Sequence, residues 1–90
     1  MKITYDAQKD KINISKHDGI SLADAKNLEW DLLIAEQDTR FQYDDIRMLG
    51  FAPIGRIVYC VVFIEENDHY HIISFRKADK KEVRKYASQI

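Results

Sequence analysis

The chain has 90 residues, enough for one domain, residues 1–90, with a modest hydrophobic core. Hydrophobic residues make up 46% of the chain and charged residues 32%, a balance that excludes a disordered chain. The formal net charge of -1 excludes a strong overall basic field, so nucleic-acid binding would need a local basic face.

The single cysteine, Cys60, lies inside an apolar run, where we expect it to be buried as a small hydrophobic residue. One cysteine allows no intrachain disulfide, as is usual in a reducing compartment. No apolar run approaches the roughly 18 residues of a membrane span, and the N-terminus has no apolar signal region. We therefore expect a cytoplasmic protein without a membrane partner.

The N-terminal residues predict a short strand followed by a helix. Residues 2–5 alternate polar and apolar side chains, as an edge strand does. Asp6 is a suitable N-cap for a helix that runs to about His17. Gly19 suits the end of that helix, because glycine readily adopts the left-handed conformation.

A second helix is predicted to follow at once. The segment from Ser21 to Asp24 matches a capping box, which marks a helix N-terminus. We expect this helix to end near Trp30. Its apolar face consists of Leu22, Ala25 and Leu28.

The middle of the chain predicts four consecutive strands. The first is 32–35, and the second runs from about 43 to 51, with Pro53 marking the turn after it. The third, 55–64, is almost unbroken β-branched and aromatic, which is typical of a strand covered on both faces. A polar turn separates it from the fourth, 69–78. Consecutive pairing of these strands gives a four-strand antiparallel meander.

A C-terminal helix is predicted to begin at a second capping pattern, Asp79 to Glu82. Its apolar residues recur at i, i+3, i+4 and i+7, which predicts one stripe: Val83, Tyr86, Ala87 and Ile90. We expect this stripe to pack onto the sheet and Val83→Asp to unfold the domain, because it would bury an unpaired charge. The predicted fold is a two-layer α+β domain: an N-terminal strand, two helices, the meander and a C-terminal helix.

The sequence lacks the residue patterns of metal sites, phosphate-binding loops and serine nucleophiles. His69 and His71 share a strand face, but no third ligand lies at a suitable spacing for zinc. The three glycines are scattered, so no phosphate-binding loop is present, and no serine stands in a nucleophile elbow. We therefore expect neither a metal nor a cofactor.

The remaining candidates for chemistry are cationic: Lys16, His17, Arg47 and Arg76. Arginines on a sheet beside a Lys-His pair can hold a phosphodiester and stabilise the negative charge of its transition state. RNA supplies its own nucleophile in the 2′-hydroxyl, so a histidine or lysine need only move protons, without a metal or covalent intermediate.

Simpler interpretations of these cations stay open. Lys16 and His17 complement the dipole at a helix C-terminus, and Asp45 is a candidate ion-pair partner for Arg47. The cations of the C-terminal helix suit an ordinary solvated face that an acidic partner segment could meet: Lys80, Lys81, Arg84 and Lys85.

A set of spaced residues over nearly the whole chain carries a family resemblance. The most specific run is Ile72 to Ala78, with the sequence Ile-Ile-Ser-Phe-Arg-Lys-Ala. The other matching residues are Asn13, Lys16, His17, Gly19, Ser21, Asp24, Ala25, Arg47, Met48, Gly50, Ala52 to Arg56, Glu82, Val83 and Tyr86. On these residues the chain resembles the BrnT family, ribonuclease toxins of bacterial type II toxin–antitoxin modules.

The resemblance implies a RelE-like fold and an endoribonuclease that cleaves RNA without a metal and arrests translation. It also implies a BrnA-type antitoxin that neutralises the toxin and supplies the operator-binding domain, so that operator DNA is contacted only through the complex. Carried over by position, the site residues are Lys16, His17, Arg47 and Arg76.

Two positions depart from the family pattern. His71 stands where the family commonly has arginine, and Asp45 stands where it often has glutamate. Histidine titrates near neutrality, so phosphate binding on this face would be weaker and more pH-dependent. The alternative function is therefore a catalytically weak or inactive interaction module that binds its antitoxin and assists repression of the operon.

Overall fold

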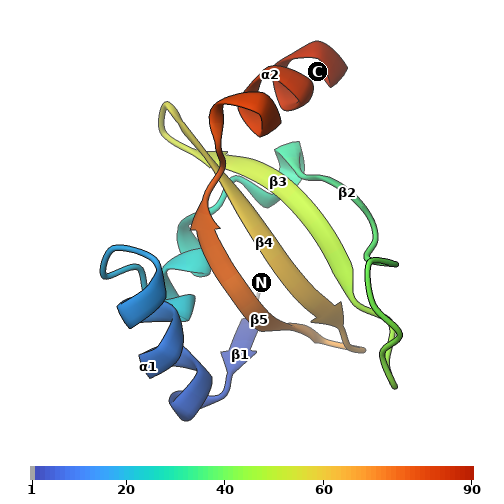
Figure 1. The fold of residues 1–90 in the computed structure, drawn as a ribbon. Coiled ribbons are helices and arrows are strands. Elements are labelled where there is room, and N and C mark those ends of the chain that lie inside the picture. Colours follow the sequence, from blue (N-terminus) through green and yellow to red (C-terminus); the bar gives the residue numbers. More distant parts are fainter. Residues whose placement is uncertain (1) are drawn as a thin grey trace.

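A mixed sheet of five strands forms the centre of the protein, whose residues 2–90 are described in a computed structural model (Figure 1). The strand order is β1-β5-β4-β3-β2. The strands are β1 (Lys2–Tyr5), β2 (Ile34–Gln37), β3 (Met48–Ile54), β4 (Ile57–Glu65) and β5 (His69–Lys77). The helices are α1 (Ala7–Lys16), the two 3-10 helices η1 (Leu22–Asn27) and η2 (Trp30–Leu32), and α2 (Lys80–Gln89).

The α+β class is confirmed, but the predicted sheet is incomplete. Strands β2 to β5 pair in sequence order and antiparallel. Strand β1 then adds to β5 in parallel, from Lys2 opposite His69 to Tyr5 opposite Ile72. The four-strand antiparallel meander and the RelE-like arrangement therefore match only in part. The sequence predicted an edge strand at residues 2–5 but not its pairing with β5, because strands far apart in the chain pair through contacts that no local pattern shows.

The β3–β4 hairpin differs from prediction at both ends of β3. The strand begins at Met48, five residues later than predicted, and continues through Pro53, which pairs with Val58. Proline is tolerated there because β2 pairs only as far as Phe51, so no sheet partner needs the missing N–H. The turn is made by the residues after Ile54, and Gly55 has a left-handed φ of 60°.

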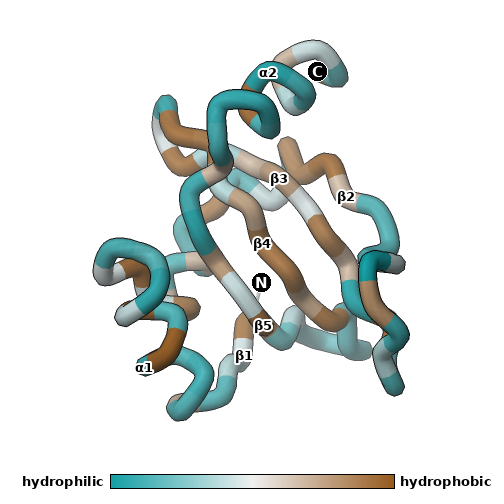
Figure 2. The backbone as a smooth tube through the Cα atoms, in the orientation of Figure 1, coloured by the Kyte–Doolittle hydropathy of each residue, from teal (hydrophilic) through white to brown (hydrophobic). Residues whose placement is uncertain are grey.

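The hydrophobic core lies between one face of the sheet and η1 (Figure 1). The predicted apolar face of this helix is confirmed, although the helix is 3-10: Leu22 and Ala25 are fully buried, and the Ser21 capping box is present. The sheet contributes Ala52, Val61, Phe63, Ile72 and Phe75. Figure 2 shows how hydrophobic residues concentrate along β4, the central strand of the sheet.

The C-terminal helix does not cover the sheet as predicted. Helix α2 begins with the predicted capping box but projects past the end of β5 (Figure 1). Val83 is 37% exposed and Ile90 79% exposed, whereas Tyr86 is buried and donates its hydroxyl to the Leu32 carbonyl at 2.6 Å. The periodicity identified the helix correctly, but only Tyr86 of the stripe makes the predicted packing. Within residues 2–90, no helix has the length and apolar character needed to span a membrane.

The expected unfolding by Val83→Asp is thus wrong, because the new carboxylate would stay in water. We expect Val83→Asp to change the free energy of unfolding by no more than about 0.5 kcal/mol, as at other surface positions. Tyr86→Ala should lower it by about 2 kcal/mol, because it removes a buried ring and its hydrogen bond. Urea denaturation followed by circular dichroism measures both, and a Val83→Asp protein that does not fold would contradict this packing of α2.

Candidate functional site

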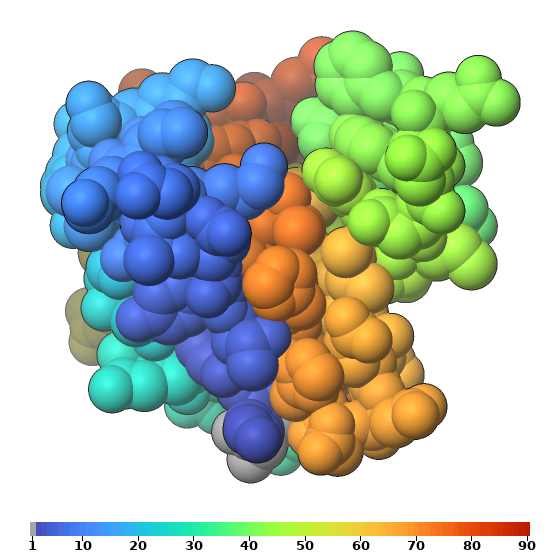
Figure 3. Space-filling model, turned by 90° about the horizontal axis from the view of Figure 1, so that it is seen from below, coloured from blue at the N-terminus to red at the C-terminus, as the bar shows by residue number. Residues whose placement is uncertain are grey.

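A groove crosses the sheet face opposite the core, with α1 on one side and the segment 38–47 on the other (Figure 3). It consists of two adjoining hollows of about 160 and 220 Å³, and both are lined by Ile73 and Ser74 of β5. We call it the cationic groove and define it by the basic side chains that line it: Lys9, Lys16, His17, Arg40, Arg47 and Arg76.

A β-bulge in β5 forms the floor of the cationic groove. Ser74 pairs with Val62 of β4, but Ile72 pairs with the very next residue, Phe63, so Ile73 has no partner on β4. A bulge of this kind breaks the alternation of side chains. Ile73 and Ser74 therefore both line the groove, while Ile72 stays in the core.

Asn13 holds α1 beside the groove. Strand β1 ends opposite Ile72, which leaves the outer edge of β5 free beyond that residue. The buried Asn13 side chain takes this edge: its Nδ2 donates to the Phe75 carbonyl at 2.8 Å, and its Oδ1 accepts the Phe75 N–H at 3.2 Å. Nδ2 also donates to the carbonyl of Ile20 at 2.9 Å. The amide thereby fixes α1 to the sheet and to the loop that follows the helix.

His17 is the C-cap of α1 and lies on the groove side of the helix. Burial lowers the pKa of its imidazole, and the nearby charges of Arg76 and Lys16 lower it further. The effect of Arg76 means that the fold has brought the end of α1 close to the end of β5. The neutral imidazole that results near pH 7 is able to accept a proton.

Arg76 projects from β5 and is held by α2. Its Nη1 and Nη2 donate to the two carboxylate oxygens of Glu82 at 2.8 and 3.0 Å, and Nη1 also donates to the Lys77 carbonyl at 3.2 Å. The paired carboxylate raises the pKa of Arg76, which stays charged. Glu82 also accepts the Asp79 N–H at 2.9 Å, so one carboxylate caps α2 and orients the arginine.

Arg47 reaches the groove from the other side. The sequence predicted that Arg47 lies within a strand, but in the structure it lies just before β3. Its Nε donates to Asp45 at 3.0 Å, so the predicted ion pair is confirmed, and its guanidinium lies 4.3 Å from the ring centroid of Tyr43. All four predicted residues, Lys16, His17, Arg47 and Arg76, therefore line one groove, although their roles in catalysis stay predictions.

Sequence reasoning missed a third arginine of the groove, Arg40, and the acid that holds it. Asp38 is buried and accepts hydrogen bonds from Arg40 Nε at 2.8 Å, from Arg40 Nη2 at 2.9 Å and from the Tyr43 hydroxyl at 3.2 Å. The bonds from Arg40 lower the pKa of Asp38 to about 2. Its own N–H donates to the Arg47 carbonyl at 2.7 Å. These bonds close the 38–47 segment, whereas residues 43–47 were expected to belong to the second strand of the meander.

The other candidates of the sequence have ordinary roles. His71 shares a 2.9 Å hydrogen bond with Thr4 Oγ1, at the β1 end of β5. Cys60 is buried as predicted, and burial raises the pKa of its thiol to about 11, which suits no thiolate nucleophile. In the part of the chain that the structure describes, no group of three or more histidine, cysteine, aspartate or glutamate side chains could hold a metal.

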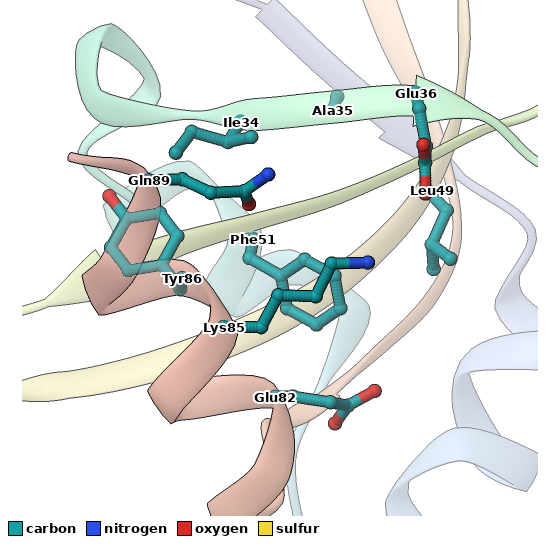
Figure 4. Close-up of a pocket in the computed structure, with 9 residues that line it drawn as sticks. All are labelled: Ile34, Ala35, Glu36, Leu49, Phe51, Glu82, Lys85, Tyr86 and Gln89. Carbon is teal, nitrogen blue, oxygen red and sulfur yellow. The ribbon is translucent and has the colours of Figure 1, made fainter.

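A hollow larger than either part of the groove lies apart from these cations. Its volume is about 360 Å³, and it separates α2 from the strands β2 and β3. Figure 4 shows Tyr86, Lys85 and Gln89 from the helix facing Ile34 and Phe51 from the strands. None of the predicted site residues lines it. We interpret this hollow as a packing gap between α2 and the sheet, because Tyr86 is the buried residue of the helix.

The role of Asn13 gives a direct stability test. Asn13→Ala should lower the free energy of unfolding by about 3 kcal/mol, because it leaves the buried N–H of Phe75 without its partner. Urea denaturation measures the loss, and Asn27→Ala at an exposed position serves as the matched control. An Asn13→Ala protein as stable as the control would show that α1 is held by other contacts.

The comparison with family models identifies the chain. A model described as ribonuclease toxin, BrnT, of type II toxin-antitoxin system matches residues 5–82. A search of curated proteins found no significant match. The matched range contains every basic residue of the cationic groove and ends at Glu82, the acid that holds Arg76. The chain belongs to the BrnT family of ribonuclease toxins of type II toxin–antitoxin systems.

Proposed function

We propose that this BrnT-family chain cleaves RNA without a metal, thereby arresting translation, and that the cationic groove is its active site. The observation that carries the proposal is the gathering of Lys16, His17, Arg47 and Arg76 around the floor made by Ile73 and Ser74. These residues come from three separate parts of the chain, and the fold directs them to one surface.

In this proposal the scissile phosphodiester lies over the bulge of β5, between Arg47 and Arg76. Each guanidinium is already oriented by a carboxylate, so little reorganisation is needed when negative charge develops on the phosphoryl oxygens. Glu82 occupies two donors of Arg76, and the phosphate would use the remaining N–H groups.

Proton transfer is assigned to the end of α1. Neutral His17 takes the proton of the ribose 2′-hydroxyl as the bond between the 2′-oxygen and phosphorus forms. The bond from phosphorus to the 5′-oxygen breaks, and Lys16 donates a proton to that leaving oxygen. The products are a 2′,3′-cyclic phosphate and a free 5′-hydroxyl. The low pKa of His17 supports the role of base, since the imidazole is mostly neutral at neutral pH.

A type II system pairs its toxin with an antitoxin protein, so the family implies such a partner. We propose a BrnA-type antitoxin that neutralises the chain and carries the contact with operator DNA. The outer face of α2 supports this pairing, because Lys81 and Arg84 are exposed there and would meet an acidic segment.

A second function is favoured by one observation: three arginines of the groove already have a carboxylate partner. Asp38 holds Arg40, Asp45 holds Arg47, and Glu82 holds Arg76. Such pairing lowers the positive potential that a polyanion would meet. Together with His71 in place of the usual arginine, it supports a weak or inactive toxin that binds its antitoxin and assists repression.

The test of the leading proposal is RNA cleavage in the presence of EDTA. Purified wild-type protein should cleave RNA there, because no step needs a metal. Arg76→Ala should lower the rate at least about 100-fold, the scale for removing one preorganised donor. The experiment measures single-turnover cleavage of a labelled RNA.

Glu82→Gln is the matched control for that variant, since it disturbs the ion pair and the cap of α2 but keeps the arginine. We expect a smaller loss than that of Arg76→Ala, because the arginine remains but is less well oriented, whereas an equal loss would mean that Arg76 acts only when the carboxylate holds it. Cleavage that disappears with EDTA and returns with Mg²⁺ would exclude the metal-independent mechanism. A folded wild type that binds its antitoxin but cleaves no RNA would select the second function.

The pKa of His17 predicts the pH dependence of cleavage. Activity should rise with pH through the lowered pKa, which lies below the ordinary value of 6.5, because only the neutral imidazole accepts a proton. His17→Gln should lack this ascending limb and be slower by about 100-fold. The same lowered pKa makes the folded state less stable as pH falls below 6.5, so circular dichroism must confirm folding at each pH. An unchanged ascending limb in His17→Gln would assign the base to another residue.

A further inference from the structure

Two aromatic side chains, Phe41 and Tyr43, lie on the segment that borders the cationic groove. Phe41 is 68% exposed, and its ring centroid lies 6.1 Å from that of Tyr43 in an edge-to-face arrangement. Tyr43 lines the groove together with Arg40 and Arg47. The ring of Phe41 is not part of the hydrophobic core, so its faces are open to a ligand.

The segment that carries these rings is held in place. The Tyr43 hydroxyl donates to the buried Asp38, which also receives three hydrogen bonds from Arg40. The Arg47 guanidinium lies over the Tyr43 ring, 4.3 Å from its centroid, and is itself bound to Asp45. Phe41 is therefore presented by a preorganised turn, and it loses little conformational entropy when a ligand contacts it.

The order of side chains along this rim matches an RNA strand that leaves the groove. Arg47 lies where the proposed scissile phosphate binds, Tyr43 comes next, and Phe41 follows at the edge. Arg47 covers one face of Tyr43, which makes Phe41 the more accessible ring. The guanidinium of Arg40, on a side chain 54% exposed, provides a positive charge for the backbone beside it.

We propose that Phe41 is a stacking platform for an unpaired RNA base next to the phosphate held in the cationic groove. The inference rests on the proposed ribonuclease function and adds a subsite to it. Base stacking on an aromatic ring requires an unpaired base, so the subsite selects single-stranded RNA. A protein partner is the competing occupant for an exposed phenylalanine, but the continuity of this ring with Tyr43 and Arg47 of the groove favours RNA.

The subsite is testable without cleavage. The probe is a short single-stranded oligonucleotide with 2′-O-methyl riboses, which cannot be cleaved, and with 2-aminopurine at one position. Stacking quenches the fluorescence of 2-aminopurine, so moving this base along a set of oligonucleotides locates the subsite. We expect wild-type protein to quench the probe strongly at one or two positions.

Variants of the same turn supply the comparison. Phe41→Ala and Phe41→Leu should both lose the quenching and bind the probe about tenfold more weakly, whereas Phe41→Tyr should retain both. The matched control is Ile46→Ala, because Ile46 is 65% exposed on the same segment but carries no ring. It should quench and bind like wild type. Phe41→Ala should still cleave RNA, but with a higher KM.

The outcomes separate this inference from the function on which it rests. Wild-type cleavage together with equal quenching by wild type and Phe41→Ala would overturn the subsite alone. A wild type that neither binds the probe nor cleaves RNA would overturn both proposals. Normal quenching by Phe41→Ala combined with weaker capture by the cognate antitoxin would assign the ring to the protein partner and overturn the subsite.

Discussion

The contact of Asn13 with the backbone of Phe75 is the interaction on which the site depends. Strand β1 pairs with only the first four residues of β5, and the chain then turns away into α1. Backbone groups left at that edge need partners, because a buried N–H without one costs about as much as a lost hydrogen bond. One amide side chain provides both a donor and an acceptor, much as a further strand residue would. The position of α1, and with it the position of Lys16 and His17, follows from this contact.

The groove combines positive charge with fixed geometry through its acidic residues. Asp38, Asp45 and Glu82 each form an ion pair with one arginine. The chain therefore has a basic groove although its net charge is -1. An arginine held by a carboxylate is well oriented but electrostatically weaker toward a second anion. The structure thus favours rigid positioning over a strong general attraction for nucleic acid. Such an arrangement suits a site that must act on one bound phosphate.

Helix α2 contacts the cationic groove through Glu82 and the rest of the fold through Tyr86. Glu82 links the first turn of the helix to Arg76, and Tyr86 makes the one buried contact of its apolar residues. The family match ends at Glu82, so the part of α2 that the match includes is the part that contacts the site.

The sequence by itself determined most of the local elements, although the helix after Ser21 is 3-10 and residues 43–47 precede β3 instead of belonging to it. Capping patterns at Asp6, Ser21 and Asp79 located three helix starts, and the apolar runs located the strands, because caps and side-chain periodicity depend on neighbouring residues. The cationic candidates for the site were predicted from residue chemistry and from family resemblance, and the burial of Cys60 was predicted from the run around it.

Only the tertiary structure decided which elements meet. The parallel pairing of β1 and the contact of Asn13 with Phe75 join residues far apart in the chain, and no local pattern encodes them. The bulge at Ile73 lies within the β4–β5 hairpin, but the sequence contained no signal for it either. The packing of α2 was mispredicted for the same reason: periodicity shows that a helix has an apolar side but not what that side contacts. The cluster around Asp38 was missed because residues 43–47 were assigned to a strand, and no local pattern shows that Arg40 and Tyr43 both bind Asp38. Contacts between distant residues are selected by the free energy of the whole fold, and this is where the site is assembled.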